Sequence, residues 1–127
     1  TTTRYYWCNA FDPRYANFSD RNDPSGASVQ SLNDGQAVTA PVGSYLSNRF
    51  GLSDMAGNVW EWTCSEYDRN YSGQEQGCSD RSANEGLRVV RGGSWNNGPG
   101  DLRSAKRLSR KPDYRDAMTG FRVVMEE

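Results

Sequence analysis

Arg88-Val-Val-Arg-Gly-Gly-Ser-Trp-Asn-Asn97 is the stretch that decides the fold, together with Gly120-Phe-Arg-Val-Val124 further along the chain. Their apolar and β-branched residues predict one strand over Leu87–Arg91 and a closing strand over Phe121–Met125. Between them lies a polar segment rich in Gly, Asn, Arg and Asp. Two strands that frame such a segment indicate a scaffold that presents a surface of loops, where binding or catalytic residues commonly lie.

Composition indicates one irregular domain. The 127 residues include 13 glycines and 35% hydrophobic residues, with 4 Trp, 7 Tyr and 4 Phe. A core of a few large aromatic side chains between many glycines is typical of a turn-rich fold and not of a helical bundle. We therefore expect a single domain over residues 1–127, with a modest core.

Charge and hydropathy argue against several kinds of partner. The formal net charge is −1, so no global positive field would recruit nucleic acid or an anionic membrane. No run approaches the ~18 apolar residues that a membrane-spanning helix needs. The segment 96–119 is locally basic, but no base-reading module accompanies it, and we expect no nucleic-acid partner. Arg103, Arg107 and Arg122 are expected to brace loops through carboxylates or backbone carbonyls.

Histidine is absent, and its absence removes the commonest general base and metal ligand from these residues. Ser-His-Asp, Cys-His and histidine–iron chemistry are therefore excluded for them. The cysteines Cys8, Cys64 and Cys78 have no CxxC spacing and no histidine nearby, which argues against a zinc site. Cys64 and Cys78 flank a polar loop, where they form either a disulfide or two reduced thiols.

The rest of the chain predicts short elements joined by long loops. Aromatic residues within 1–11 indicate a strand or a packed segment, and further short strands are expected at 41–50, 59–63 and 102–107. Trp60 and Trp62 are two residues apart on the strand at 59–63, so their rings share one face. The shortage of aliphatic residues favours a place in the core for both rings over a role as a ligand platform.

Oxygen donors gather in two parts of the chain. Residues 12–40 are dominated by Asp, Asn, Ser and Gly, and so long an irregular stretch needs something to hold it, such as a bound cation. Asp54 and Glu61 flank a glycine-bearing turn, so two carboxylates and turn carbonyls can form the oxygen shell that Ca²⁺ requires. The competing interpretation is turn chemistry, in which Asp and Asn side chains bond to their own backbone.

Four ordered motifs resemble one known family. They are Gly51-Leu-Ser-Asp-Met-Ala-Gly-Asn-Val-Trp-Glu-Trp62, Arg88-Val-Val-Arg-Gly-Gly-Ser-Trp95, Leu102-Arg-Ser-Ala105 and Gly120-Phe-Arg-Val-Val124. Together they resemble the formylglycine-generating-enzyme/sulfatase-modifying-factor family over most of the chain. The resemblance implies an irregular α+β, C-type-lectin-like fold of short antiparallel strands and long loops.

The resemblance covers only the C-terminal portion of a family domain. The N-terminal portion, with its Leu-Pro-Thr-Glu-type helix, has no counterpart in this sequence. We therefore expect a missing N-terminal segment or a partner chain to complete the domain.

The resemblance also implies two structural calcium sites, in which side-chain oxygens and backbone carbonyls act together. We call the first group of ligands the Asp54 set and the second, which precedes the Thr-Ala-Pro-Val motif, the Asn17 set. The Asp54 set consists of Asp54, Gly57, Val59 and Glu61, and the Asn17 set consists of Asn17, Phe18, Asp34 and Gln36.

Catalytic chemistry of the family is not supported by these residues. Catalytic members oxidise a sulfatase cysteine with copper held by two cysteines just after the Gly-Gly-Ser-aromatic motif. Here that stretch reads Asn96-Asn97-Gly98-Pro99-Gly100-Asp101, without the thiolates that soft Cu(I) requires. Ergothioneine-type relatives hold iron with histidines, which are absent. Both chemistries are excluded unless the missing portion supplies a site.

The function that remains is recognition. Some members of the family are variable proteins of diversity-generating retroelements, whose segment between Gly-Gly-Ser-Trp and Gly-Phe-Arg-Val-Val is diversified and binds ligands. The resemblance implies an unidentified protein or small-molecule ligand and gives no cellular location. A diverged oxidoreductase or maturation factor is the competing function, and a structural assembly component is a third. The expected recognition residues are Asn97, Gly98, Gly100, Asp101, Lys106, Leu108, Arg110, Lys111, Tyr114, Asp116, Ala117 and Met118.

Overall fold

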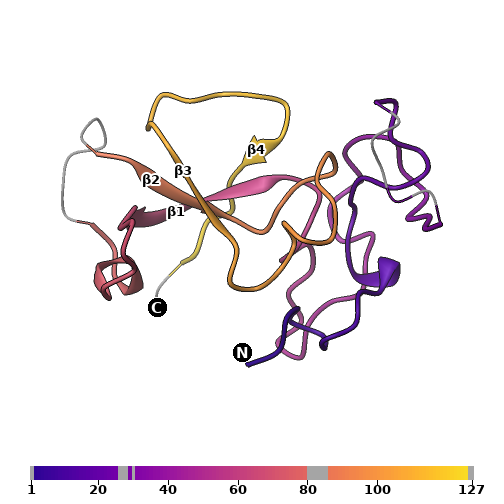
Figure 1. The fold of residues 1–127 in the computed structure, drawn as a ribbon, viewed down its shortest axis with the longest axis horizontal. Coiled ribbons are helices and arrows are strands. Elements are labelled where there is room, and N and C mark those ends of the chain that lie inside the picture. The colour runs from indigo at the N-terminus through magenta and orange to yellow at the C-terminus, as the bar shows by residue number, and fades with distance from the viewer. Residues whose placement is uncertain (1, 26–28, 30, 80–85, 126–127) are drawn as a thin grey trace.

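A computed structural model describes residues 2–25, 29, 31–79 and 86–125 of the chain (Figure 1). An amino-terminal part made of loops and turns lies beside a small sheet formed by the later part of the chain. In the described residues, no helix combines the length and the apolar character needed to cross a membrane.

The sheet has four strands in the spatial order β3-β2-β1-β4. They are β1 Trp60–Glu66, β2 Arg88–Arg91, β3 Arg107–Arg110 and β4 Thr119–Gly120. The pairs β1/β2 and β2/β3 are antiparallel, while the short β4 lies parallel to β1. The strands expected at 59–63 and Leu87–Arg91 are therefore confirmed.

Helical structure is sparse. The described residues contain two 3-10 turns, η1 Pro13–Tyr15 and η2 Gln74–Gln76, and no α-helix. Short strands and long loops are present as expected, but the described part of the chain is mostly β and not α+β.

Two expected strands are not found at their predicted positions. The strand expected at 102–107 is wrong in its position: turns closed by Leu102 N–H on Pro99 O and by Lys106 N–H on Arg103 O occupy that segment, and β3 begins only at Arg107. No strand forms at 41–50, where the backbone turns on itself.

The closing strand expected at Phe121–Met125 is wrong. In this part of the chain only the two residues of β4 pair with a strand, and Phe121, Val123 and Val124 are 75%, 84% and 85% exposed. Beyond Gly120 the described residues of the tail pair with no strand, although the side chain of Arg122 contacts Glu61 on β1. The apolar residues of the tail therefore make no hydrogen bonds to a neighbouring strand, and β propensity alone does not form a strand.

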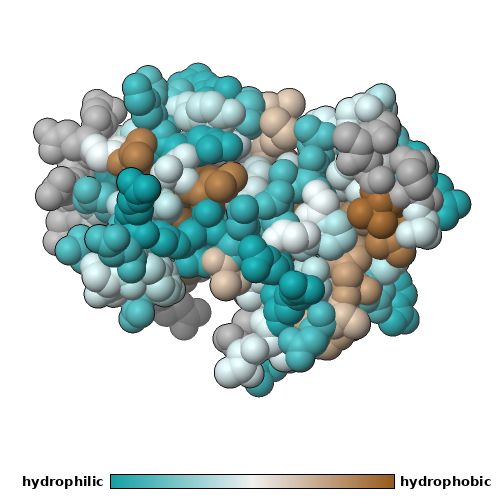
Figure 2. Space-filling model, viewed as in Figure 1, coloured by the Kyte–Doolittle hydropathy of each residue, from teal (hydrophilic) through white to brown (hydrophobic). Residues whose placement is uncertain are grey.

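The main hydrophobic core lies in the amino-terminal part, and half-buried aromatic rings such as those of Trp7 and Phe11 pack against it. It consists of Tyr5, Ala16, Phe18, Ala56 and Leu102. The ring of Trp7 stacks on the rings of Tyr5 and Tyr15, with centroid distances of 4.9 and 5.0 Å. This confirms the packed segment at 1–11 and rules out the strand. Figure 2 shows a mostly hydrophilic face on which apolar residues form small separate patches.

Trp60 and Trp62 differ in burial. Trp60 is 3% exposed, and the structure confirms its expected place in the core. Trp62 is half-buried, so the expectation of a core position holds for it only in part.

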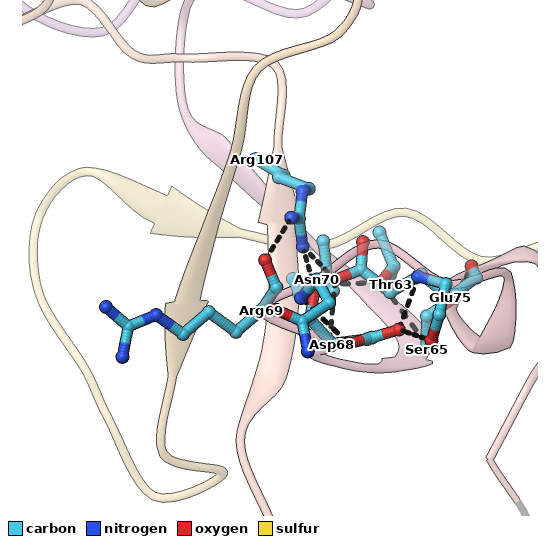
Figure 3. Close-up of polar contacts among 9 residues, drawn as sticks. Thr63, Ser65, Asp68, Arg69, Asn70, Glu75 and Arg107 are labelled. Carbon is cyan, nitrogen blue, oxygen red and sulfur yellow. Dashed lines mark hydrogen bonds and ion pairs between the residues drawn. The ribbon is translucent and has the colours of Figure 1, made fainter.

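The loop after β1 is held at two places. A disulfide joins Cys64 to Cys78, which decides between the two states that the sequence left open. Arg107 on β3 forms an ion pair with Glu75, whose side chain is 1% exposed, and donates to Asp68 O at 2.6 Å (Figure 3). The bracing role expected for Arg107 is confirmed, whereas Glu75 carries no sequence signal that singles it out as the partner.

Candidate functional site

Asn58 connects three segments at the centre of the candidate site. Its N–H donates to Asn17 O, and its own carbonyl accepts from Trp95 N–H, both at 2.9 Å. Its side-chain amide bonds to both backbone groups of Ala40, at 3.0 and 3.2 Å. Asn58 is buried at φ 64°, a left-handed conformation that Asn tolerates better than most residues. The sequence interpretation missed this residue, although the Gly-Asn pair at 57–58 is a recognisable turn signal.

Gly57, a member of the Asp54 set, lies against the backbone of Asn17. It has φ +76°, and a Cβ at this position would lie 2.1 Å from Asn17 O. Its N–H donates to Gly92 O at 2.8 Å, which holds the turn against β2 and the loop that follows it. Gly57 therefore brings the Asp54 set into direct contact with the Asn17 set.

The side chain of Asn17 has one satisfied end and one unsatisfied end. Its Nδ2 donates to Val38 O at 2.8 Å. Its Oδ1 has no hydrogen-bond partner among the residues that the structure describes, and Asn17 is 0% exposed. A buried acceptor without a partner costs free energy, so this oxygen is a place where a cation or a donor would stabilise the fold.

Hydrogen bonds to backbone N–H groups hold the carboxylate of Asp34 next to the residue that follows Asn17. This carboxylate accepts from Phe18 N–H at 2.7 Å and from Gln36 N–H at 2.8 Å. The structure thus brings together the four members of the Asn17 set. Burial, with the negative charge of Asp20 as a smaller cause, raises the pKa of Asp34 to about 6.

Two members of the Asp54 set, Asp54 and Glu61, are linked by the guanidinium of Arg122. Arg122 donates to both carboxylate oxygens of Glu61, at 2.5 and 2.7 Å, and to Asp54 O at 3.0 Å. The carboxylate of Asp54 accepts from Gly43 N–H at 2.7 Å. The expected bracing role of Arg122 is confirmed, and its charge neutralises Glu61, one of the carboxylates that the sequence interpretation assigns to a metal ion.

Both sets consist of oxygen donors, which is the chemistry that a hard cation such as Ca²⁺ prefers. In the described ranges, no three or more His, Cys, Asp or Glu side chains could hold a metal together, so amide and carbonyl oxygens would have to contribute. Asn17 Oδ1 is free to do so, whereas Glu61 would have to share its carboxylate between a cation and Arg122. The Asn17 set therefore fits a cation better than the Asp54 set.

Asn97 belongs to the scaffold and not to an open surface. Its Oδ1 accepts from Trp60 Nε1 at 2.8 Å and from Ser94 Oγ at 2.6 Å, and its carbonyl accepts from Ser19 N–H at 2.9 Å. Its Nδ2 donates to Asp101 at 3.3 Å. With its side chain occupied in this way, we remove Asn97 from the recognition residues that the sequence suggested.

An ordered network lies in the loop after β3. The guanidinium of Arg110 lies over the ring of Tyr114, 4.8 Å from its centroid. The hydroxyl of Tyr114 donates to Asp116 at 2.8 Å, and Asp116 also accepts from Met118 N–H at 3.0 Å. Tyr114 is thus exposed but held in one orientation.

The remaining recognition residues divide by exposure and position. Those before and after β3 lie at opposite ends of that strand, so they form two groups (Figure 1). Lys106 forms an ion pair with Asp101 at 2.7 Å, and Leu108 lies opposite Val90 in the sheet. The exposed members are Gly100, Lys111, Tyr114 and Ala117, and the half-buried members are Gly98, Asp101, Lys106, Leu108, Arg110, Asp116 and Met118.

Comparison with known proteins repeatedly identifies the same family. A family model described as the sulfatase-modifying factor enzyme 1-like domain matches residues 1–127. A Bos taurus protein named inactive C-alpha-formylglycine-generating enzyme 2 is 32% identical over 94% of this chain. A formylglycine-generating enzyme from Streptomyces coelicolor is 37% identical over 76% of it. The chain spans 36% and 32% of the lengths of these two relatives.

A solved structure shares the fold. Treponema denticola variable protein 1 superimposes with a TM-score of 0.62 at 27% identity, over 85% of this chain and 34% of that protein. This likeness supports the C-type-lectin-like frame of short strands and long loops that the sequence predicts.

Proposed function

The chain belongs to the sulfatase-modifying factor enzyme 1-like family, and from this premise we propose that it is a non-catalytic binding domain. Its ligand, a protein or a small molecule, contacts the loops of segment 96–119. Calcium, bound at the Asn17 and Asp54 sets, stabilises the scaffold beneath those loops.

The observation that carries the proposal is the role of Asn97. It lies just after the Gly-Gly-Ser-aromatic motif, where the resemblance places the copper-binding thiols of catalytic members. Its amide accepts from Trp60 and Ser94 at 2.8 and 2.6 Å, so the position serves the scaffold. An amide has no redox chemistry and does not hold Cu(I).

Two of the similar proteins support this interpretation by their names. The bovine relative is described as inactive, and the Treponema protein is described as a variable protein. The shared frame therefore occurs outside active enzymes.

The recognition surface centres on the network of Arg110, Tyr114 and Asp116. A tyrosine that is exposed yet held by its hydroxyl offers a large amphipathic contact at low entropic cost. Lys111 and Ala117 are exposed in the same loop and contribute specificity.

Calcium binding is supported most directly by the Asn17 set. Asn17 Oδ1 is buried and unpaired, and burial leaves Asp34 a carboxyl group that a nearby cation would stabilise in its charged form. At the Asp54 set a cation shares Glu61 with Arg122, so we propose weaker binding there.

The recognition proposal is tested by randomising residues in a displayed population. Randomising Lys111, Tyr114 and Ala117 should leave the protein folded and should yield variants that bind a chosen target such as lysozyme. Randomising Asn97 and Ser94 is the matched control, which should lose folded protein because these side chains bond internally. Equal survival of both populations, or loss of folding in the first, would overturn the proposal.

A diverged oxidoreductase is the second candidate, favoured by the 37% identity to the Streptomyces enzyme. It predicts that the chain, given Cu(I) and oxygen, converts the cysteine of a sulfatase-derived peptide to an aldehyde. The binding-domain proposal predicts no aldehyde, as detected by mass spectrometry after oxime formation. Aldehyde produced above a protein-free control would decide for the enzyme.

A further inference from the structure

A large cavity lies away from the Arg110–Tyr114–Asp116 network. It has a volume of about 680 Å³, which is within the range of small-molecule sites. Apolar side chains from distant parts of the chain line it, among them Met55, Trp62, Leu102 and Val124. Such a wall favours an apolar group of a ligand.

Three arginines face the same cavity with one carboxylate. Arg122 is paired with Glu61 at 2.5 Å. Within the described ranges, the side chains of Arg91 and Arg103 hydrogen-bond to backbone carbonyls, Ser104 O at 3.3 Å and Gly100 O at 2.7 Å. A guanidinium carries five N–H donors, so most of the donors on these two side chains remain available.

The register of the sheet fixes part of this arrangement. Arg91 on β2 lies directly opposite Glu61 on β1, so the two side chains project from the same face of the sheet. The carboxylate of Glu61 is already held by Arg122, which leaves Arg91 without an acidic partner among the described residues. The cavity therefore carries excess positive charge beside an apolar wall.

We propose that this cavity binds an amphipathic organic carboxylate. The aliphatic or aromatic part of the ligand packs against Trp62 and Met55, and the carboxylate is bound by Arg91 and Arg103. Arginine suits this role because its planar fork binds carboxylates through two parallel hydrogen bonds.

A second large cavity, lined by aromatic residues, is a poorer candidate for a ligand site. It lies near Trp7 and Phe50 and has a volume of about 690 Å³. The ring of Trp7 is already stacked on Tyr5 and Tyr15, and Arg49 lies over the ring of Phe50. Fewer open ring faces remain there for a ligand.

The test is isothermal titration of the 127-residue chain with decanoate below its critical micelle concentration. Decanol and decyltrimethylammonium serve as neutral and cationic probes of the same chain length. We expect saturable binding of decanoate and at least tenfold weaker binding of the cation, about the effect of losing a charge-assisted hydrogen bond. Failure of decanoate to bind, or equal binding of the cation, would overturn the proposal.

Variants locate the site. Arg103→Gln and Arg91→Gln should each weaken decanoate binding by about tenfold, since each removes one charged donor group. Arg49→Gln, at the other aromatic cavity, is the matched control and should leave binding unchanged. Because Arg103 is exposed, its variant should also keep the melting temperature of the parent. Unchanged decanoate affinity in both cavity variants would overturn the assignment.

Discussion

The Asn17 set and the Asp54 set are in contact at Gly57, yet only one of them has its carboxylate neutralised by a cationic side chain. Glu61, in the Asp54 set, is neutralised by Arg122, which is distant in sequence and donates to both of its oxygens. In the described part of the Asn17 set no cationic side chain pairs with Asp34, and Asn17 Oδ1 lacks a donor. The two groups of oxygen donors thus differ because the guanidinium of Arg122 reaches only the Asp54 set.

The largest expected loss of stability comes from a substitution at Gly57, where the two sets are in contact. Gly57→Ala should reduce the free energy of unfolding by more than about 3 kcal/mol, because overpacking adds to the strain of a left-handed backbone. The reason is the 2.1 Å approach of the new Cβ to Asn17 O. Urea unfolding measures the loss.

Gly51→Ala is the matched control for this experiment. Gly51 has the same φ of +76°, but a Cβ added there would meet no atom within 4 Å, so the variant tests backbone strain alone. It should cost about 1 kcal/mol. Equal losses in the two variants would contradict the close approach at Gly57.

The next largest expected effect is the stabilisation of the chain by calcium. At a concentration 100 times its Kd, calcium should stabilise the chain by about 2.7 kcal/mol, measured as a rise in Tm that EDTA reverses. Asn17→Ala should abolish most of the rise, whereas Glu61→Gln should keep most of it, because Glu61 is already paired with Arg122. A Tm that responds to neither calcium nor EDTA would show that the sets hold no tight cation.

The pKa of Asp34 predicts a smaller effect of pH in calcium-free buffer. Its folded pKa is raised to about 6 from 3.8, so the folded state binds the proton more tightly than the unfolded state. The stability gained by protonation is complete below pH 3.8 and is lost as pH rises through about 6. The loss should be about 1–2 kcal/mol after allowance for solvent screening.

Asp34→Asn isolates this contribution from other titrating groups. The difference in unfolding free energy between parent and variant should change between pH 4 and pH 6.5 and be flat above that range. A difference curve that is flat throughout would contradict the raised pKa.

Removing the guanidinium should give the smallest effect and should make the two sets more alike. Arg122→Met should cost about 1 kcal/mol, because the Glu61–Arg122 pair is partly exposed and screened. Calcium should then stabilise the variant more than the parent, since Glu61 becomes free to bind it. Arg14→Met, which breaks an exposed pair with Asp12, is the control and should change neither quantity.

Local pattern predicted the strands well where they were paired and poorly where they were not. Leu87–Arg91 forms β2 because strands on both sides take up its hydrogen bonds, whereas Phe121–Met125 has the same kind of sequence but pairs with no strand in the described part of the chain. Asn97 shows the same limit for side chains. Its place in a polar loop suggested exposure, but the approach of Trp60 and Ser94 buries its bonds.

The sequence by itself determined the family, the short-strand frame and the absence of histidine and of the copper-binding thiols, because these depend on residue identity and order. Only the tertiary structure decided that Cys64 bonds to Cys78, that Arg107 pairs with the buried Glu75, and that Arg122 pairs with Glu61 of the Asp54 set. Each of these contacts joins residues that are well separated along the chain. Their energies depend on distance and burial, which a linear pattern does not contain.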